Sequence, residues 1–211
     1  MTKTRSTIRG TPFPHALILL CLLCAACVFS ACPRKTGDTL GEPAPGGPPA
    51  AYHVALVDSF ARHAFVPNGT FDARQLKAKK YLFIYFASPR NEGSLRFTPK
   101  LVGFYNDVRQ NGDDDIGVIF VSTDKTQHEM NDFMLAAAMP WPGVRANSPA
   151  AVDLRGRYES PNIPCLVLLD ENDNILASSH NEAGPNLPAR PIATYQKLKQ
   201  AGQGKPKEKK K

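Results

Sequence analysis

The stretch YFASPRNEGSLRFTP (residues 85–99) decides the fold, because a buried strand, a short polar turn and a helix follow one another in it. The apolar run YLFIYFA (81–87) is continuous rather than alternating, which is typical of a strand covered on both faces. The segment FTPKLVGFYNDVRQ (97–110) predicts a helix, and we expect Pro99 inside it to kink that helix. Ligands of α/β proteins often bind at the carboxyl ends of strands, so the turn PRNEGS (89–94) is where we look first for a functional residue.

The rest of the chain continues this alternation of strands and helices. The apolar runs IGVIFVS (116–122) and CLVLLD (165–170) predict buried strands, and ILASS (175–179) predicts a strand that returns from a turn as a hairpin. Helices are predicted in 51–65, 127–138 and 191–202, a short helix at most in 152–159, a turn with a short edge strand in 66–76, and a loop in 139–144. This order predicts a single α/β domain, with a central mixed β-sheet flanked by helices.

The net charge of +7 is confined to the two ends of the chain. Lys3, Arg5 and Arg9 lie at one end and the tail KPKEKKK (205–211) at the other, and the charges between them sum to zero. A nucleic-acid-binding domain carries its positive charge on the fold itself. We therefore expect no nucleic-acid partner, and we interpret residues 202–211 as a solvated basic tail.

Residues 1–31 have the pattern of a signal peptide. A basic start is followed by an apolar run of 16 residues (16–31), shorter than the roughly 20 residues of a membrane-spanning helix. Phe29-Ser30-Ala31-Cys32 resembles the bacterial lipoprotein signal, in which the cysteine is acylated, although Leu, Val or Ile is usual where Phe29 stands. We expect lipidation of Cys32, a Pro/Gly-rich tether over 32–50 and a domain over 51–201 that faces the periplasm or the cell surface. Ordinary secretion and an uncleaved anchor are the alternatives.

The positions of the cysteines limit the chemistry of the domain. Four of the five cysteines lie in the segment 21–32, where cleavage before Cys32 removes three and lipidation blocks the fourth. The exported domain then keeps one thiol, Cys165, and can form no internal disulfide.

The segments YLFIYFAS, FTPKLVGFY, VIFVSTD, MPW and NIPCLVLLD, in this order, resemble the thioredoxin-like superfamily, and within it the nucleoredoxin and tryparedoxin branch. The resemblance extends over about residues 71–198. It implies a thioredoxin-like fold in which the Ile163-Pro164 peptide is cis and faces the turn, and a family activity of thiol–disulfide exchange.

The turn departs from that branch at the residues that matter most. The branch has an aromatic residue and then Cys-Pro-Pro-Cys shortly before Phe-Thr-Pro; here Arg90 stands at the aromatic position, and Asn91 and Ser94 stand at the two cysteine positions. Exchange needs one thiolate to attack and a second thiol to release the mixed disulfide, so we exclude the dithiol mechanism at this turn. We expect Ser88 or Asn91 to cap the helix, with Arg90 adding a positive charge that Glu92 opposes. The turn is then either a cap alone or a site for a carboxylate.

Three residues outside the turn complete the predicted site. In the thioredoxin-like fold, the main chain before the cis proline aligns an extended partner chain by strand-like pairing, which points to Ile163 and Pro164. Cys165 is either a small buried hydrophobe, whose pKa an apolar strand raises, or a lone redox thiol. Trp141, between two prolines, is a packing or rim aromatic, and is a binding anchor if exposed.

The sequence therefore predicts a lipid-anchored thioredoxin-like domain without a redox dithiol. We expect no cofactor and no metal site, because the histidines have no ligand spacing and the acidic segment 170–174 lacks that of a calcium loop. The predicted role is to bind a protein or peptide, with Arg90, Asn91, Trp141, Ile163 and Pro164 as binding residues. The alternatives are a thiol–disulfide oxidoreductase acting as a monothiol through Cys165, and a structural lipoprotein whose basic tail touches anionic polymers of the envelope.

Overall fold

The computed structural model describes residues 50–180 and 185–203. The predicted signal peptide, the acylated Cys32, nearly all of the tether and the basic residues 204–211 lie outside these described residues. In the part of the chain that is described, the helices are too short or too polar to cross a membrane.

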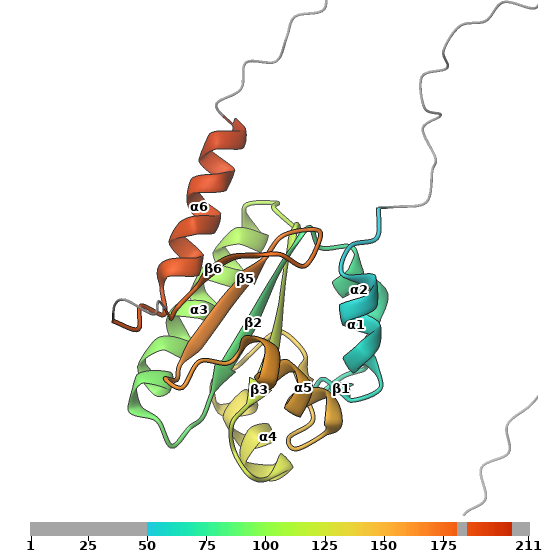
Figure 1. Ribbon diagram of the computed structural model, residues 1–211, viewed down its shortest axis with the longest axis vertical. Coiled ribbons are helices and arrows are strands. Elements are labelled where there is room, and N and C mark those ends of the chain that lie inside the picture. The colour runs from blue at the N-terminus through green and yellow to red at the C-terminus, as the bar shows by residue number, and fades with distance from the viewer. Residues whose placement is uncertain (1–49, 181–184, 204–211) are drawn as a thin grey trace, which may run out of the picture. The chain divides into compact units, whose positions relative to one another are not determined.

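Helices and strands alternate along the chain as predicted (Figure 1). The elements are α1 (Val54–Ala61), β1 (Ala64–Phe65), α2 (Ala73–Lys77), β2 (Tyr81–Ala87), α3 (Glu92–Gln110), β3 (Ile116–Ser122), α4 (Gln127–Ala136), β4 (Gly143–Val144), α5 (Pro149–Tyr158), β5 (Cys165–Leu169), β6 (Ile175–Ser178) and α6 (Arg190–Gln203).

The strands form one mixed sheet in the order β1-β4-β3-β2-β5-β6. Strand β2 is parallel to β3, which follows it through α3, and antiparallel to β5; β5 and β6 form the predicted hairpin. The pairs Ala87↔Ser122 and Phe86↔Cys165 place the end of β2 beside the end of β3 and the start of β5. The predicted α/β fold class is confirmed, and this register brings the turn after β2 close to the loop that precedes β5.

Helices cover both faces of the sheet, which explains why the central strands are apolar throughout. Figure 1 shows α3 and α6 on one side of the strands and α1 and α2 on the other. On β2, Phe83, Tyr85 and Ala87 pack in the cluster of α3, α4 and α6, whereas the alternate residues pack in the cluster of α1, α2 and α5. Successive side chains of a strand point to opposite faces, so a strand buried on both faces has no polar positions.

Four local predictions need correction. Helix α2 and strand β4 were not predicted. Helix α2 buries only Leu76 and β4 has only two residues, so neither shows a hydrophobic periodicity in the sequence. Helix α5 has ten residues and begins three residues before the short helix predicted over 152–159, with the favourable pair of a Ser148 cap and Pro149 at its first position. The helix predicted over 51–65 is shorter, because α1 ends at Ala61 and Ala64–Phe65 form strand β1, which pairs with β4.

Helix α3 begins five residues earlier than predicted and runs through Pro99 to Gln110. A proline removes one hydrogen bond of a helix, to the carbonyl four residues before it. That carbonyl belongs to Leu95, which is exposed, as is Pro99, so water can bind it in place of the missing N–H. The kink expected at Pro99 stays a prediction.

Candidate functional site

The turn after β2 is closed by its own polar side chains. Asn91 is the N-cap of α3, with an extended backbone, and its Oδ1 accepts hydrogen bonds from the Ser94 N–H (2.8 Å) and from the Ser94 hydroxyl (3.2 Å). Such a cap satisfies one of the amide groups that a helix leaves free at its start. Asn91 therefore caps the helix as predicted, and its carboxamide is turned toward Ser94.

A buried chain of hydroxyl groups fixes the first turn of α3 to the sheet. The Thr98 hydroxyl donates to the Ser94 carbonyl (2.7 Å), and the Tyr85 hydroxyl lies 2.7 Å from the Thr98 oxygen. Since Thr98 donates its only hydroxyl proton to Ser94, Tyr85 is the donor of the second bond. Burial raises the pKa of Tyr85 well above its ordinary value, so the phenol remains a donor at neutral pH.

Asp124 holds the turn to the end of β3. This side chain is buried, with the residue 4% exposed, and its two oxygens accept hydrogen bonds from the Ser88 hydroxyl (2.5 Å) and the Ser122 hydroxyl (2.9 Å). The Ser88 oxygen in turn accepts from the Arg90 N–H (3.1 Å). A buried carboxyl group without such donors would be costly, so these hydroxyls both stabilise Asp124 and define the path of the turn.

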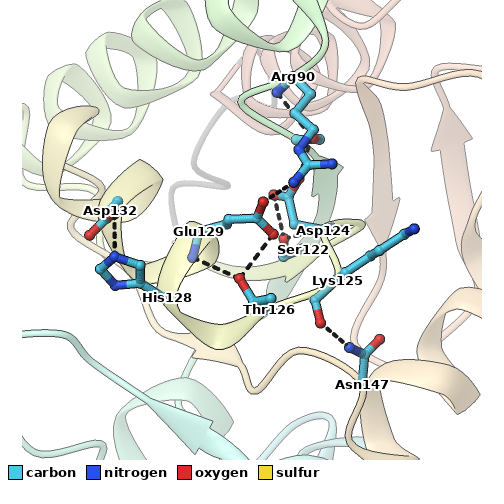
Figure 2. A network of polar contacts seen from close by, with 10 residues as sticks. Arg90, Ser122, Asp124, Lys125, Thr126, His128, Glu129, Asp132 and Asn147 are labelled. Atoms are coloured by element: carbon cyan, nitrogen blue, oxygen red, sulfur yellow. Dashed lines mark hydrogen bonds and ion pairs between the residues drawn. The ribbon is translucent and has the colours of Figure 1, made fainter.

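Arg90 crosses from the turn to the start of α4 (Figure 2). Its guanidinium forms an ion pair with Glu129. Glu129 also accepts from the hydroxyl of Thr126 (2.9 Å), and Thr126 caps α4 by accepting from the Glu129 N–H (3.2 Å). The expected opposition between Arg90 and Glu92 is wrong, because Glu92 pairs with Arg96 one turn along α3. The charge of Arg90 is therefore largely balanced by Glu129.

The loop before β5 lies against the turn. The Ile163–Pro164 peptide is cis, as the resemblance implied. A Cβ atom added to Gly93 would lie 3.1 Å from Cδ of Pro164 and 4.0 Å from the Ile163 carbonyl oxygen. The turn and the loop can approach this closely because residue 93 has no side chain.

The main chain of Ile163 is open for pairing. Neither its N–H nor its carbonyl has a hydrogen-bond partner among the described residues, whereas the carbonyl of the next residue, Pro164, accepts from the Asn186 side chain (3.0 Å). Ile163 is also only partly buried. Its carbonyl lies beside Gly93, and a main-chain donor and acceptor that lack partners among the described residues can pair with an extended chain.

Cys165 does not face this edge. The residue is fully buried, and its side chain packs in the cluster of α1, α2 and α5, on the face of the sheet opposite to α3. Burial raises the pKa of the thiol, and the Sγ atom is 3.9 Å from the Tyr158 carbonyl. Because thiolates are the reactive form of cysteine, this environment opposes the monothiol alternative and agrees with a structural role.

Trp141 does not belong to the site either. It is 1% exposed, and its ring packs edge-on against Tyr105, with ring centroids 5.5 Å apart. It also lines a cavity together with Gly117, near the start of β3. The turn meets the other end of β3, at Ser122, roughly 16 Å along the strand. Trp141 is therefore a packing aromatic, as one of the two alternatives held, and its prediction as a binding residue near the turn is wrong.

Comparison with known proteins agrees with this geometry. Residues 79–175, which include the turn, the loop before β5 and the four strands from β2 to β5, match the family model described as thioredoxin-like. This part of the chain is a thioredoxin-like α/β domain.

Three solved structures show the same thioredoxin-like fold. Thioredoxin from Wuchereria bancrofti is 24% identical with a TM-score of 0.51, over 65% of this chain and 94% of its own. Tryparedoxin I from Leishmania major is 23% identical with a TM-score of 0.51, over 75% of this chain and 98% of its own. Tryparedoxin II from C. fasciculata is 19% identical with a TM-score of 0.51, over 74% of this chain and 99% of its own.

This thioredoxin-like domain brings together four of the five predicted binding residues: Arg90, Asn91, Ile163 and Pro164. Their binding role stays a prediction. Asp124 and Glu129 were missed, although they lie within reach of the same turn. The pattern Thr126-x-x-Glu129 is a capping signature and could have located the start of α4. Nothing local in the sequence could have paired Glu129 with Arg90.

Proposed function

We propose that this thioredoxin-like domain binds an extended protein or peptide segment at the edge formed by Ile163, and that it does not catalyse disulfide exchange. The observation that carries the proposal is that the main chain of Ile163 has no hydrogen-bond partner among the described residues and lies beside a turn closed by Asn91 and Ser94. An extended segment can gain strand-like hydrogen bonds from Ile163. The turn offers it a capped helix start rather than a thiolate.

The charges at the turn fit a binding role better than a catalytic one. Asn91 uses its side-chain oxygen to hold Ser94, and Arg90 is engaged by Glu129, so both side chains serve to rigidify the turn. A rigid, preformed edge lowers the entropy cost of binding a partner. A redox turn instead needs a sulfur nucleophile at the helix start, where the helix dipole lowers its pKa.

We further propose that the domain is held at the cell envelope by a lipid on Cys32, with the segment 32–50 as its tether. The support is the signal-like pattern of residues 1–32 in the sequence. Metabolic labelling of the chain with an alkyne analogue of palmitate tests this directly. The chain should be labelled and the variant Cys32→Ser should not; equal labelling of both would remove the lipid anchor from the proposal.

The absence of redox activity is tested by reduction of insulin with dithiothreitol. The chain is used in a background in which Cys21, Cys24, Cys27 and Cys32 are serine, which leaves Cys165 as its only thiol. We expect no acceleration over dithiothreitol alone. The double variant Asn91→Cys/Ser94→Cys restores both thiols at the helix start and should accelerate the reaction. Acceleration by the parent that Cys165→Ala abolishes would instead establish the monothiol enzyme.

Peptide binding is tested with a random peptide library displayed on phage and selected on the full chain. The affinity of each selected peptide is then measured by fluorescence anisotropy. Gly93→Leu places a side chain between the turn and the Pro164 loop, whereas Gly103→Leu lies on the same helix with no neighbouring atom within 4 Å. We expect the first variant to weaken binding at least tenfold and the second to leave it unchanged. Equal affinities for both variants, or no selectable peptide, would contradict the proposed edge.

A further inference from the structure

A second candidate site lies at the other end of the sheet, independent of the proposed peptide edge. A cavity of about 330 Å³, open to the surface, is bounded by α2 with the segment before it, α3, the start of β3 and the residues before β4. Small-molecule sites have volumes from about 300 Å³ upward and are largely walled by apolar and aromatic groups. Here the aromatic wall consists of Phe71, Tyr105 and Trp141, with Pro140 and Pro142 beside the indole.

The wall contains a hydrogen-bond donor without a partner among the described residues. The indole Nε1 of Trp141 is buried and has no partner within the described part of the chain. Buried donors in proteins are nearly always paired, with protein, water or ligand, so an isolated one requires an explanation. Because Nε1 itself is buried, an acceptor of a ligand would reach it only after the ring shifts toward the cavity.

Arg109 adds a cation to the same cavity. Its guanidinium lies over the ring of Tyr105, 5.7 Å from the centroid, and donates to the Tyr105 hydroxyl (3.3 Å). The hydrogen bond from Arg109 to Tyr105 raises the pKa of the guanidinium, so the side chain is positively charged at neutral pH. The nearest carboxylate in an ion pair with it is that of Asp114, 3.9 Å from Nε, which is beyond hydrogen-bonding distance. Arg109 is exposed and keeps N–H groups available to a ligand.

The carboxylates of the cavity, by contrast, are already occupied. Asp114 is bound by the Lys79 ammonium (2.5 Å), which also donates to the Asp114 carbonyl (3.1 Å). Asp72 accepts three hydrogen bonds from Arg74, two from its guanidinium and one from its main chain. Both carboxylates that line the cavity are therefore paired with cations, whereas Arg109 keeps N–H groups for a ligand that brings acceptors.

We propose that this cavity binds a small aromatic carboxylate, with its ring against Tyr105 and Trp141 and its carboxylate on Arg109. A planar ring matches the edge-on pair of Tyr105 and Trp141, and aromatic pairs of this kind are favourable beyond the area they bury. A guanidinium binds a carboxylate through two parallel N–H groups, which a neutral carbonyl cannot reproduce. The site is distinct in its residues and in its chemistry from the turn after β2.

The test uses Trp141 as its own reporter, because it is the only tryptophan of the chain. The indole fluorescence of the full chain is titrated with benzoate, and with benzamide and benzamidine as neutral and cationic analogues of the same shape. We expect a saturable change with benzoate at a Kd of about 1 mM or tighter, binding of benzamide weakened at least tenfold, and no saturable change with benzamidine. Equal responses to the three compounds, or none to benzoate up to about 10 mM, would overturn the proposal.

Two variants on the same helix locate the carboxylate. Arg109→Gln removes the charge at the cavity and should weaken benzoate binding at least tenfold, while Arg96→Gln removes an exposed charge near the start of α3 and should leave it unchanged. Circular dichroism of both variants establishes that they are folded. If folded Arg109→Gln binds benzoate as the parent does, the assignment of Arg109 is wrong. If it does not fold, the charge series on the parent chain still decides the proposal.

Discussion

Replacing Asn91 by alanine removes the cap that closes the turn after β2. The Asn91 oxygen accepts two hydrogen bonds from Ser94, one from its main chain and one from its hydroxyl, and Ser94 is fully buried. Loss of an N-cap costs about 1 kcal/mol. A buried hydroxyl that loses its acceptor adds about 1 kcal/mol. We therefore expect Asn91→Ala to lower the free energy of unfolding by about 2 kcal/mol.

Urea unfolding of the full chain, followed by the fluorescence of the buried Trp141, measures this loss. With a urea m-value of about 2 kcal/mol/M, the midpoint should fall by about 1 M. Asn106→Ala is the matched control, because Asn106 is an exposed asparagine of the same helix whose side chain forms no hydrogen bond with the described residues. Its midpoint should move by no more than about 0.25 M. Asn91→Asp keeps the acceptor and adds a negative charge at the helix start, so it should be as stable as the parent or about 0.5 kcal/mol more stable.

A midpoint for Asn91→Ala that equals that of Asn106→Ala would refute the reasoning. The turn would then not depend on its side-chain cap, and the argument that Asn91 is engaged in the structure of the turn would fail. A loss in Asn91→Asp as large as that in Asn91→Ala would refute it equally, because the aspartate offers the same acceptor at the same position.

Three further predictions concern the core and the charged surface. Alkylation of Cys165, followed by site-resolved mass spectrometry, should be at least about 1,000-fold slower in the native chain than in urea, because the thiol is fully buried and burial raises its pKa. Rapid labelling of the native chain, with a pH midpoint below about 8.5, would favour the monothiol enzyme. Gly117→Ala should lower the free energy of unfolding by about 1–3 kcal/mol, because its Cβ would lie 2.6 Å from Leu76 Cδ1. Gly103→Ala, which has open space on α3, should raise the free energy of unfolding by about 0.5–1 kcal/mol. Urea midpoints in the reverse order would contradict the packing. Burial acts to raise the pKa of Asp113, but hydrogen bonds from Lys199 and Tyr195 hold it below the ordinary value. Its contribution to stability is therefore present above about pH 4 and is lost as the pH falls through the lowered value. Lys199→Met should therefore destabilise the chain at pH 7 and less so near pH 3. If the variant lowers the urea midpoint by the same amount at both pH values, the pairing does not matter.

The sequence alone determined the elements whose signals are local. Continuous apolar runs predicted β2, β3 and β5, because a strand covered on both faces has no polar positions. The cap of α3 was predictable because Asn91 and its partner Ser94 are three residues apart in the chain. The absence of cysteine from positions 91 and 94 needs no structure at all, and it is the strongest argument against dithiol chemistry at this turn.

The tertiary structure decided which residues meet across the chain and which face each side chain takes. Asp124 lies 36 residues from Ser88, and Glu129 lies 39 residues from Arg90, so neither contact has a local signal. Cys165 follows Pro164 directly, yet it packs on the face opposite to the turn, because the register of β5 on β2 fixes which alternate residues point to which helices. Trp141 is buried for a similar reason, since its ring packs against Tyr105 of α3, which lies 36 residues before it in the chain. Periodicity and capping depend on neighbours within one turn of the chain, whereas register and long-range pairing arise only when the sheet is assembled.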